Sequence, residues 1–366
     1  MGRSKSNQGP KERDFTAGLS VMSSCNYVGS TGEVKLDEKI LAMAQEVAGE
    51  DDACLLAEMM ITAVQITRGP IGKGDYKMMN RALKEMRVAH EVFASYRGQR
   101  KVAVFGSART SADREEYQTA VEFSRLMLEE GFMTITGAGP GIMAAGNEGA
   151  GRENSFGLNI SLPFEASANA FIAGDRKLID FNYFFTRKLS FVKEADAAVA
   201  FPGGFGTMDE IFEALTLIQT GKASVYPIVL VDAKGGDYWK SWKDFVVNHL
   251  QGDGLISDTD FALFKVTDNI QEAIDEITGF YKCFHSYRYV GDQLIIRIQE
   301  KLSVEALAGL NEQFSDIIKA GEIEQREALK EECNEPDLWH LPRIVLRHRR
   351  RDFGRLRMLI DAINKS

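Results

Sequence analysis

Short apolar runs alternate with segments of helical period through the middle of the chain, from Lys101 to Val231. The apolar runs are rich in branched and aromatic residues and predict strands at 102–108, 132–136, 156–161, 195–201 and 226–231. Between them, apolar residues recur three or four positions apart and predict helices at 117–130, within 137–150, at 187–194 and at 208–218. Buried strands separated by helices predict a parallel sheet covered on both faces, an α/β fold of the Rossmann-like, doubly wound kind.

The flanking regions have different patterns, and the changes divide the chain into four parts. Residues 1–34 are polar with little periodicity and predict a flexible arm; residues 35–98 predict a helical preface with a structural or dimer-forming role. The Rossmann-like domain then covers 99–280. A C-terminal α+β extension follows at 281–366, with a strand at 293–298, an apolar stretch at 343–346, and helices at 304–318 and 353–363.

Composition limits the class of protein. A length of 366 residues with 44% hydrophobic content supports a full core, and a formal net charge of -9 argues against nucleic acid as a partner. The four cysteines are scattered, without metal-ligand spacing, and are expected to be reduced thiols. Because there is also no membrane-spanning run or signal-peptide core, we expect a cytoplasmic protein without a membrane partner.

The glycine turn after the fourth predicted strand is the strongest candidate for a binding site. Gly203, Gly204 and Gly206 allow the backbone to approach a ligand closely, and Thr207 is expected to be the N-cap of the following helix. The free N–H groups of a helix start favour an anion, so the turn predicts a phosphate site with Glu210 beside it. The alternative is that Thr207 and Glu210 form only a capping box.

Two further glycine turns follow the first and second predicted strands, at Gly106–Ser107 and at Gly139–Gly141. Because ligands bind at the carboxyl ends of parallel strands, all three turns are expected at one edge of the sheet. The second turn has Ile142 where a dinucleotide fingerprint needs its third glycine, and Gly221-Lys222 lacks the remaining residues of a P-loop. Neither NAD nor ATP is therefore indicated, and we expect no metal or redox cofactor.

A basic pair, Arg187-Lys188, lies one helix, one strand and one turn before Glu210, so Arg187 can meet Glu210 at the same edge. An arginine fork can hold phosphate or ribose oxygens. A carboxylate can stabilise positive charge at an anomeric carbon and activate water. This combination suits cleavage of a glycosidic bond to a ribose phosphate. The alternatives are a surface ion pair and turns without a ligand.

Four motifs occur together: G-S-A-R from Gly106, G-x-G-P-G-I-M from Gly137, R-K-x-x-F from Arg187 and P-G-G-x-G-T-x-x-E from Pro202. In combination, over about Lys101 to Val231, they resemble the Lonely Guy (LOG) family of nucleoside 5'-monophosphate phosphoribohydrolases, once widely labelled lysine decarboxylases. The chain departs from many members, which have Met in place of Phe184 and Phe191.

The resemblance implies catalytic roles for Arg187 and Glu210. It implies substrate binding by Gly106, Ser107, Gly139, Gly141, Lys188, Gly203, Gly204, Gly206 and Thr207. The preface and the long tail resemble the larger bacterial members, several of which act on AMP, so AMP is the expected substrate rather than a cytokinin precursor. Family members pair through helices at the sheet edge, which implies a homodimer or a larger homo-oligomer.

Alternatives remain for the whole chain and for its tail. A non-catalytic nucleotide-binding or cofactor-carrier protein could share the scaffold, and a PLP-dependent decarboxylase has no recognisable lysine setting here. The arginine-rich segment from Arg347 to Arg357 is expected to be a solvated face paired with acidic residues. An anionic effector, for example a polyphosphorylated nucleotide, is the second possibility for that segment, and nucleic acid is the third.

Overall fold

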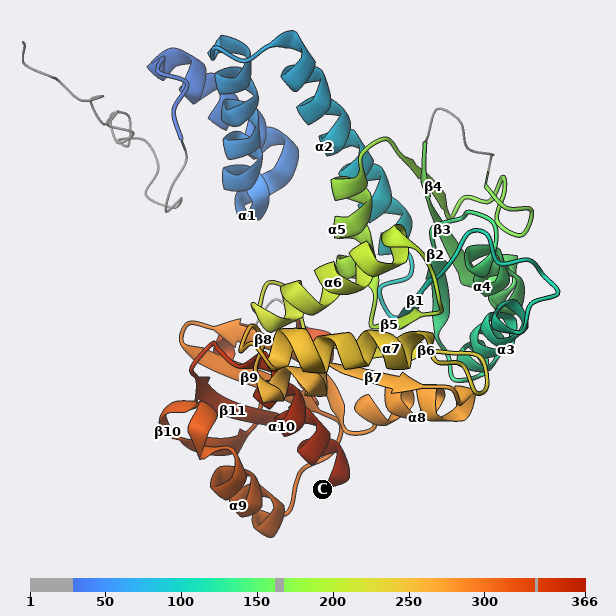
Figure 1. Cartoon of the computed structure of the whole chain (residues 1–366). Coiled ribbons are helices and arrows are strands. Elements are labelled where there is room, and N and C mark those ends of the chain that lie inside the picture. The colour runs from blue at the N-terminus through green and yellow to red at the C-terminus, as the bar shows by residue number, and fades with distance from the viewer. Residues whose placement is uncertain (1–28, 162–167, 333–334) are drawn as a thin grey trace, which may run out of the picture. The chain divides into compact units, whose positions relative to one another are not determined.

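The computed structural model describes residues 29–161, 168–332 and 335–366 (Figure 1). Most of the predicted arm, residues 1–28, lies outside this description. The chain divides into two compact units, Met1–Lys84 and Glu85–Ser366.

The first unit is helical where it is described, and the helices expected within 35–98 are present. Helix α1 covers Val34–Arg68 and is interrupted at Gly49, which has a φ of 70°. Small and branched side chains pack between its two parts. Helix α2 covers Lys73–Ala94, and its last residues belong to the second unit.

Within the described residues, the second unit contains a seven-stranded sheet in the order β4-β3-β2-β1-β5-β6-β7, with every neighbouring pair parallel. The strands are β1 Lys101–Phe105, β2 Met133–Thr136, β3 Ser155–Ile160, β4 Leu178–Phe181, β5 Ala197–Ala200, β6 Ile228–Val231 and β7 Phe264–Thr267. The chain winds outward from β1 to β4, then returns to β5 on the other side of β1. The predicted doubly wound fold is confirmed, and its switch point lies between β1 and β5.

Helices cover both faces of this sheet, as Figure 1 shows. Val102 and Val104 of β1 face one core with α3 Glu115–Glu129, α4 Ile142–Ala150 and α8 Ile270–Phe280. Ala103 and Phe105 face the other core. Its helices are α5 Phe184–Glu194, α6 Phe205–Gln219, α7 Tyr238–Phe245 and α10 Phe353–Lys365. Alternate residues of one strand thus enter two different cores, which explains why the strands are apolar throughout.

A second, antiparallel sheet lies in the C-terminal extension, with strand order β10-β11-β9-β8. Its elements are β8 Phe284–Val290, β9 Gln293–Ile298, α9 Val304–Gln313, β10 Ile318–Arg326 and β11 Arg343–His348. The helix predicted at 304–318 is therefore too long. It ends at Gln313, because Ile318 pairs with His348 in the sheet.

Short helical segments complete the described structure, at Arg152–Asn154, Val246–Gln251, Asp258–Leu263, Ser315–Ile317, Lys330–Glu332 and Pro336–Leu338. None of the described helices combines the length and apolar content that a membrane span requires.

The cysteines differ from the prediction at one position. Cys54 is disulfide-bonded, which corrects the expectation of reduced thiols for that residue, whereas Cys283 is free.

Candidate functional site

Backbone hydrogen bonds join the three glycine turns at the carboxyl edge of the sheet. The N–H of Ser107, after β1, donates to the carbonyl of Pro202, after β5, at 3.1 Å. The N–H of Ile142, after β2, donates to the carbonyl of Ser107 at 3.0 Å. The predicted convergence is therefore present, and it lies at the switch point where such sheets bind ligands.

The glycines of these turns serve two purposes. Gly141 has a φ of 65°, and a Cβ there would lie 2.2 Å from the carbonyl oxygen of Ser107, so only glycine fits. Gly106, Gly139 and Gly203 are also tightly packed, against Ile142, Met143 and Thr207. Gly204 and Gly206, in contrast, face open space. The first group holds the turns together, and the second leaves the backbone accessible.

Helix α6 begins earlier than the sequence suggested. Its first residue is Phe205, and Gly204 occupies the N-cap position with extended backbone and no side-chain cap. Thr207 is the third helical residue and is buried, so the prediction that it caps the helix is wrong, as is the capping-box alternative. The exposed turn at Gly204 therefore leads directly into the free N–H groups of the first helical turn.

Arg187 and Glu210 meet across α5 and α6. Nη2 of Arg187 lies 3.4 Å from Oε1 of Glu210, and the two side chains are only 13% and 9% exposed. The Arg187 guanidinium also lies 5.0 Å from the ring centre of Phe184. A largely buried cation on α5 thus faces a largely buried carboxylate on α6, the helix that follows the glycine turn.

Burial raises the pKa of Glu210 to about 6, although Arg187 and Lys188 act to lower it. A carboxyl with this pKa is mainly ionised at neutral pH and can still accept a proton readily. The group is thus suited to stabilising positive charge or to activating water.

Lys188 points toward a different set of acids. Its ammonium lies 2.7 Å from Asp209 and forms a second ion pair with Glu213. Burial acts to lower the pKa of Lys188, but the hydrogen bonds to these two carboxylates raise it overall. Its charge is therefore already balanced within α6.

Three residues without a role in the sequence analysis hold these elements in place. Buried Glu85 accepts hydrogen bonds from the N–H of Asn182 at 3.0 Å and from the hydroxyl of Thr186 at 2.7 Å, which fixes the start of α5. Asn169 donates to the carbonyls of Ala138 and Gly139, both at 3.0 Å. The hydroxyl of Tyr238 donates to the carbonyl of Gly203. These partners are distant in sequence, and no local motif marks them.

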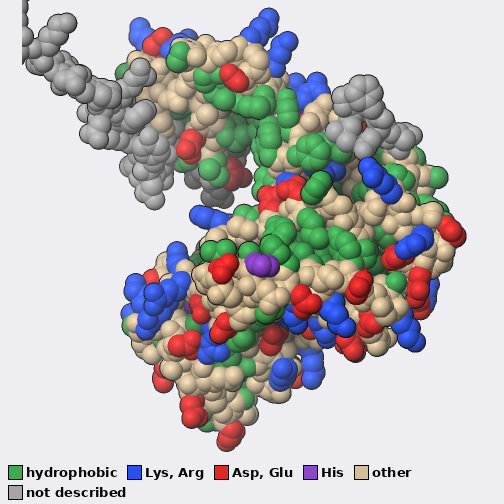
Figure 2. All heavy atoms as spheres, in the orientation of Figure 1, with side chains coloured by type: hydrophobic (Ala, Val, Ile, Leu, Met, Phe, Trp, Pro, Cys, Tyr) green, Lys and Arg blue, Asp and Glu red, His purple; other side chains and the backbone are tan. Residues whose placement is uncertain are grey.

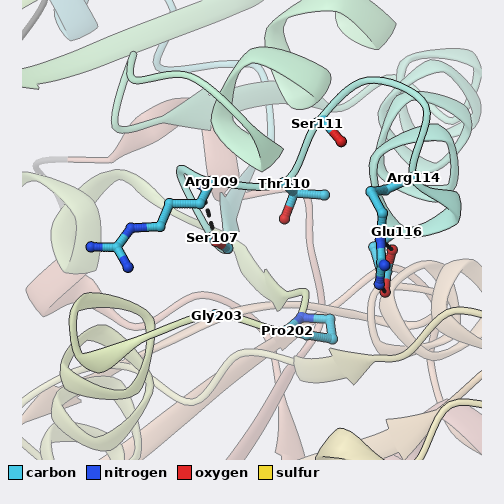
Figure 3. A pocket seen from close by; sticks show the side chains of 8 residues that line it. All are labelled: Ser107, Arg109, Thr110, Ser111, Arg114, Glu116, Pro202 and Gly203. Carbon is cyan, nitrogen blue, oxygen red and sulfur yellow. Dashed lines mark hydrogen bonds and ion pairs between the residues drawn. The ribbon is translucent and has the colours of Figure 1, made fainter.

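A cavity of about 400 Å³ opens between the first and third turns (Figure 3). It is lined by Ser107, Arg109, Thr110, Ser111, Arg114, Glu116, Pro202 and Gly203. Ser107 and Gly203 were predicted to bind substrate, whereas Arg109 belongs to the G-S-A-R motif but received no role. Hydroxyl groups, backbone and the Arg109 guanidinium suit an anionic or sugar-like ligand better than an apolar one, whereas Arg114 is paired with Glu116.

Exposed hydrophobic residues, most of them aromatic, lie on the two helices that carry the pair. Figure 2 shows hydrophobic side chains gathered where α5 and α6 lie. The exposed members on these helices are Phe184, Phe185, Leu189, Phe205 and Phe212. The pair therefore lies next to apolar surface that could receive a base or another chain.

The arginines of the C-terminal segment mostly have partners. Arg355 pairs with Asp316 at 2.8 Å, Arg357 with Asp361 at 2.8 Å and Arg347 with Asp292 at 3.6 Å. Arg349 donates to the carbonyl of Ile318 and Arg350 to that of Gly291. Arg347, Arg355 and Arg357 thus pair with acidic residues as expected, but Arg357 is buried, so the prediction of a solvated face is wrong for that residue. Across the described residues, no group of three or more His, Cys, Asp or Glu side chains is placed to hold a metal ion.

Comparison with known proteins gives one family match and several partial relatives. The model of the family described as "Possible lysine decarboxylase" matches residues 141–277. A cytokinin riboside 5'-monophosphate phosphoribohydrolase of Mycobacterium tuberculosis is 36% identical over 89 residues, which is 24% of this chain and 45% of that protein. A second cytokinin riboside 5'-monophosphate phosphoribohydrolase, LOG3 of Arabidopsis thaliana, is 29% identical over 97 residues, covering 26% of this chain and 43% of that protein. The chain thus spans less than half the length of these relatives.

An uncharacterized protein of Archaeoglobus fulgidus is 30% identical over 134 residues, covering 36% of this chain and 83% of that relative. Among solved structures, the molybdenum cofactor binding protein of Rippkaea orientalis aligns with a TM-score of 0.37 and 20% identity. That alignment covers 49% of this chain and 96% of the other. A likeness at this level carries no argument about function.

Proposed function

The chain belongs to the Lonely Guy (LOG) family, and from that premise we propose that it hydrolyses the N-glycosidic bond of a nucleoside 5'-monophosphate. The products are the free base and ribose 5-phosphate. The observation that carries the proposal is the largely buried Arg187–Glu210 pair, 3.4 Å apart, beside the exposed glycine turn at the switch point. Two partial relatives, which match 24% and 26% of this chain, are named cytokinin riboside 5'-monophosphate phosphoribohydrolases.

Each part of the site has a place in the reaction. The 5'-phosphate binds at Gly204 and Gly206, where the backbone is open and the N–H groups of α6 are free. As the bond between the anomeric carbon and the base nitrogen breaks, positive charge develops on the ribose. The carboxylate of Glu210 stabilises that charge and accepts a proton from the water that adds to the anomeric carbon. The leaving base takes up one proton, equivalent to the proton that Glu210 accepts from the water, so one water is added across the bond and Glu210 returns to its ionised form.

Arg187 positions the ribose phosphate and Glu210 together. Its guanidinium can donate to ribose or phosphate oxygens in a fixed fork while it remains beside the carboxylate. Glu85 supports this geometry indirectly, because its hydrogen bonds fix the start of α5. Among the monophosphates we propose AMP as the preferred substrate, with the apolar surface at Phe184 next to Arg187 available to the base.

Incubation of the purified protein with AMP, GMP, CMP, IMP and adenosine, followed by chromatography, tests the proposal. We expect free base and ribose 5-phosphate from the monophosphates, fastest from AMP, and no base from adenosine. Equal cleavage of adenosine would contradict the phosphate-anchored site. Nucleotide binding without cleavage of any substrate would instead support the non-catalytic carrier.

A further inference from the structure

The charge balance of the proposed site is incomplete. A bound 5'-phosphate brings a charge of about -1.5 to -2 near neutral pH. Arg187 is paired with Glu210, and Lys188 is paired with both Asp209 and Glu213. The basic residues of the R-K motif thus face at least as many carboxylates, and a further cation is needed to balance the phosphate.

Arg109 is placed to supply that charge. It lines the 400 Å³ cavity together with Ser107 and Gly203, and its N–H donates to the hydroxyl of Ser107 at 3.1 Å. The N–H of Ser107 in turn donates to the carbonyl of Pro202, next to Gly203, which ties Arg109 to the phosphate turn. Within the described part of the chain, the Arg109 guanidinium has no ion pair or hydrogen-bond partner.

The other arginine of the cavity is already neutralised. Arg114 lies 2.7 Å from Glu116 and makes two hydrogen bonds to that carboxylate. Figure 3 shows Arg109 and Arg114 on opposite sides of the cavity, with Ser107 and Thr110 between them. The two residues therefore provide a matched comparison of a paired and an unpaired arginine in one cavity.

We propose that Arg109 is a substrate-binding residue whose guanidinium holds the 5'-phosphate at the glycine turn. The inference rests on the proposed function, because it assumes that a phosphate binds beside Gly203–Gly206. It assigns to the G-S-A-R turn a direct part in recognising the phosphate, in addition to its packing against Gly141.

Loss of this contact affects binding more than the chemical step. The phosphate is remote from the bond that breaks, so its contact with Arg109 is similar in the ground state and in the transition state. Removal of a charge-assisted hydrogen bond then raises KM by about tenfold to a hundredfold. It leaves kcat within about threefold.

The test compares Arg109→Gln, Arg109→Lys and the control Arg114→Gln with the wild-type protein. We expect Arg109→Gln to raise KM for AMP and to weaken inhibition by inorganic phosphate, each by about tenfold or more. Arg109→Lys keeps the charge and is expected to restore part of the loss. Arg114→Gln is expected to change either quantity by less than about twofold.

Direct binding separates this inference from the proposed function. If the wild-type protein cleaves no nucleotide, calorimetry with AMP and ribose 5-phosphate still compares the same variants. Weaker binding by Arg109→Gln then supports the inference although the proposed activity fails. If Arg109→Gln keeps the KM and the phosphate affinity of the wild-type protein, the inference about Arg109 is overturned and the proposed function is unaffected. If the wild-type protein binds none of these phosphates, the inference and the proposed function are both overturned.

Discussion

At the scale of single residues, the environment of Glu210 determines what the site can do. Burial raises the pKa of its carboxyl to about 6, and Arg187 and Lys188 limit the rise. The same carboxyl in water would titrate near 4.3 and would be a weaker proton acceptor. The site therefore combines a charge that can stabilise the reacting ribose with a basicity suited to neutral pH.

A pH profile follows from this pKa. The proposed mechanism needs an ionised Glu210, so kcat is expected to be constant above the raised pKa and to fall as pH decreases through about 6. Because the substrate phosphate also titrates near pH 6, Lys188→Met provides the control. Loss of that cation raises the pKa of Glu210 further and moves the acid limb to higher pH. An acid limb that does not move would assign the titration to the substrate.

The contact between Arg187 and Glu210 could be predicted from the sequence. The rest of one helix, one strand and one turn separate the two residues, and this path places both side chains at the same edge of the sheet. The sequence alone could not show which carboxylates pair with Lys188, since Asp209, Glu210 and Glu213 all lie on the same helix. Glu85 could not be predicted at all. It contacts Asn182 over 97 positions of sequence, and nothing local distinguishes it from other helical glutamates.

At the scale of elements, the site is an assembly of turns whose glycines differ in purpose. Gly141 packs closely against the backbone of Ser107, whereas Gly204 has open space around its Cα and leaves the backbone at the start of α6 accessible. Substitutions at the two positions should therefore separate folding from binding.

Gly141→Ala is expected to lower the free energy of unfolding by at least about 1–3 kcal/mol, because its positive φ and the carbonyl of Ser107 exclude a Cβ. Gly204→Ala should change stability by less than about 0.5 kcal/mol, since its Cβ enters open space with an ordinary φ of -91°. The same methyl group would obstruct the phosphate and raise KM. Thermal unfolding and steady-state kinetics of the two variants measure both effects. Equal stability of the two proteins would contradict the packing described for Gly141.

The strands show how far apolar patterns identify elements. The central strands β1, β5 and β6 are buried on both faces and appear in the sequence as short apolar runs. The edge strands β4 and β7 were missed, because they contain Asp180 and Lys265 and are only partly buried. The start of α6 was placed at Thr207 because a threonine is a common cap, whereas the glycine turn itself provides the N-cap.

At the scale of the whole molecule, the C-terminal extension has a buried ionic centre of its own. Glu332 is fully buried and lies 2.6 Å from Arg297 and 3.0 Å from Arg343, which are also buried. Burial acts to raise the pKa of Glu332, but hydrogen bonds from Arg343 and Arg297 lower it overall. The carboxylate therefore stabilises the fold above its ordinary pKa, and this contribution is lost as pH falls through the lowered value.

Glu332→Gln is expected to destabilise the protein by about 3–5 kcal/mol, because two buried guanidinium groups lose their shared counter-charge. The control is Glu327→Gln. Its ion pair with Lys301 is exposed, at 70% and 61% of the side chains, and is worth about 0–1 kcal/mol. Denaturant unfolding of both variants measures the difference. Similar stability of Glu332→Gln and Glu327→Gln would mean that the cluster does not hold the extension together.

The assembly state is a separate prediction at this scale. The exposed apolar residues of α5 and α6 lie beside the proposed site, and association between copies of the chain would remove such surface from water. We expect light scattering of the purified protein to give at least twice the chain mass of 40.7 kDa. A monomeric mass across the concentrations used for activity would contradict the predicted homo-oligomer.

The most direct test of the proposed mechanism is the turnover of AMP by Glu210→Gln, measured together with AMP binding. Glutamine keeps the shape of the side chain but removes the charge and the proton acceptor, so kcat is expected to fall by at least about 10²–10⁴-fold. Affinity for AMP should remain within a few fold, because the phosphate turn is unchanged. A kcat close to that of an active wild-type protein, with intact binding, would show that Glu210 does not perform the chemistry assigned to it.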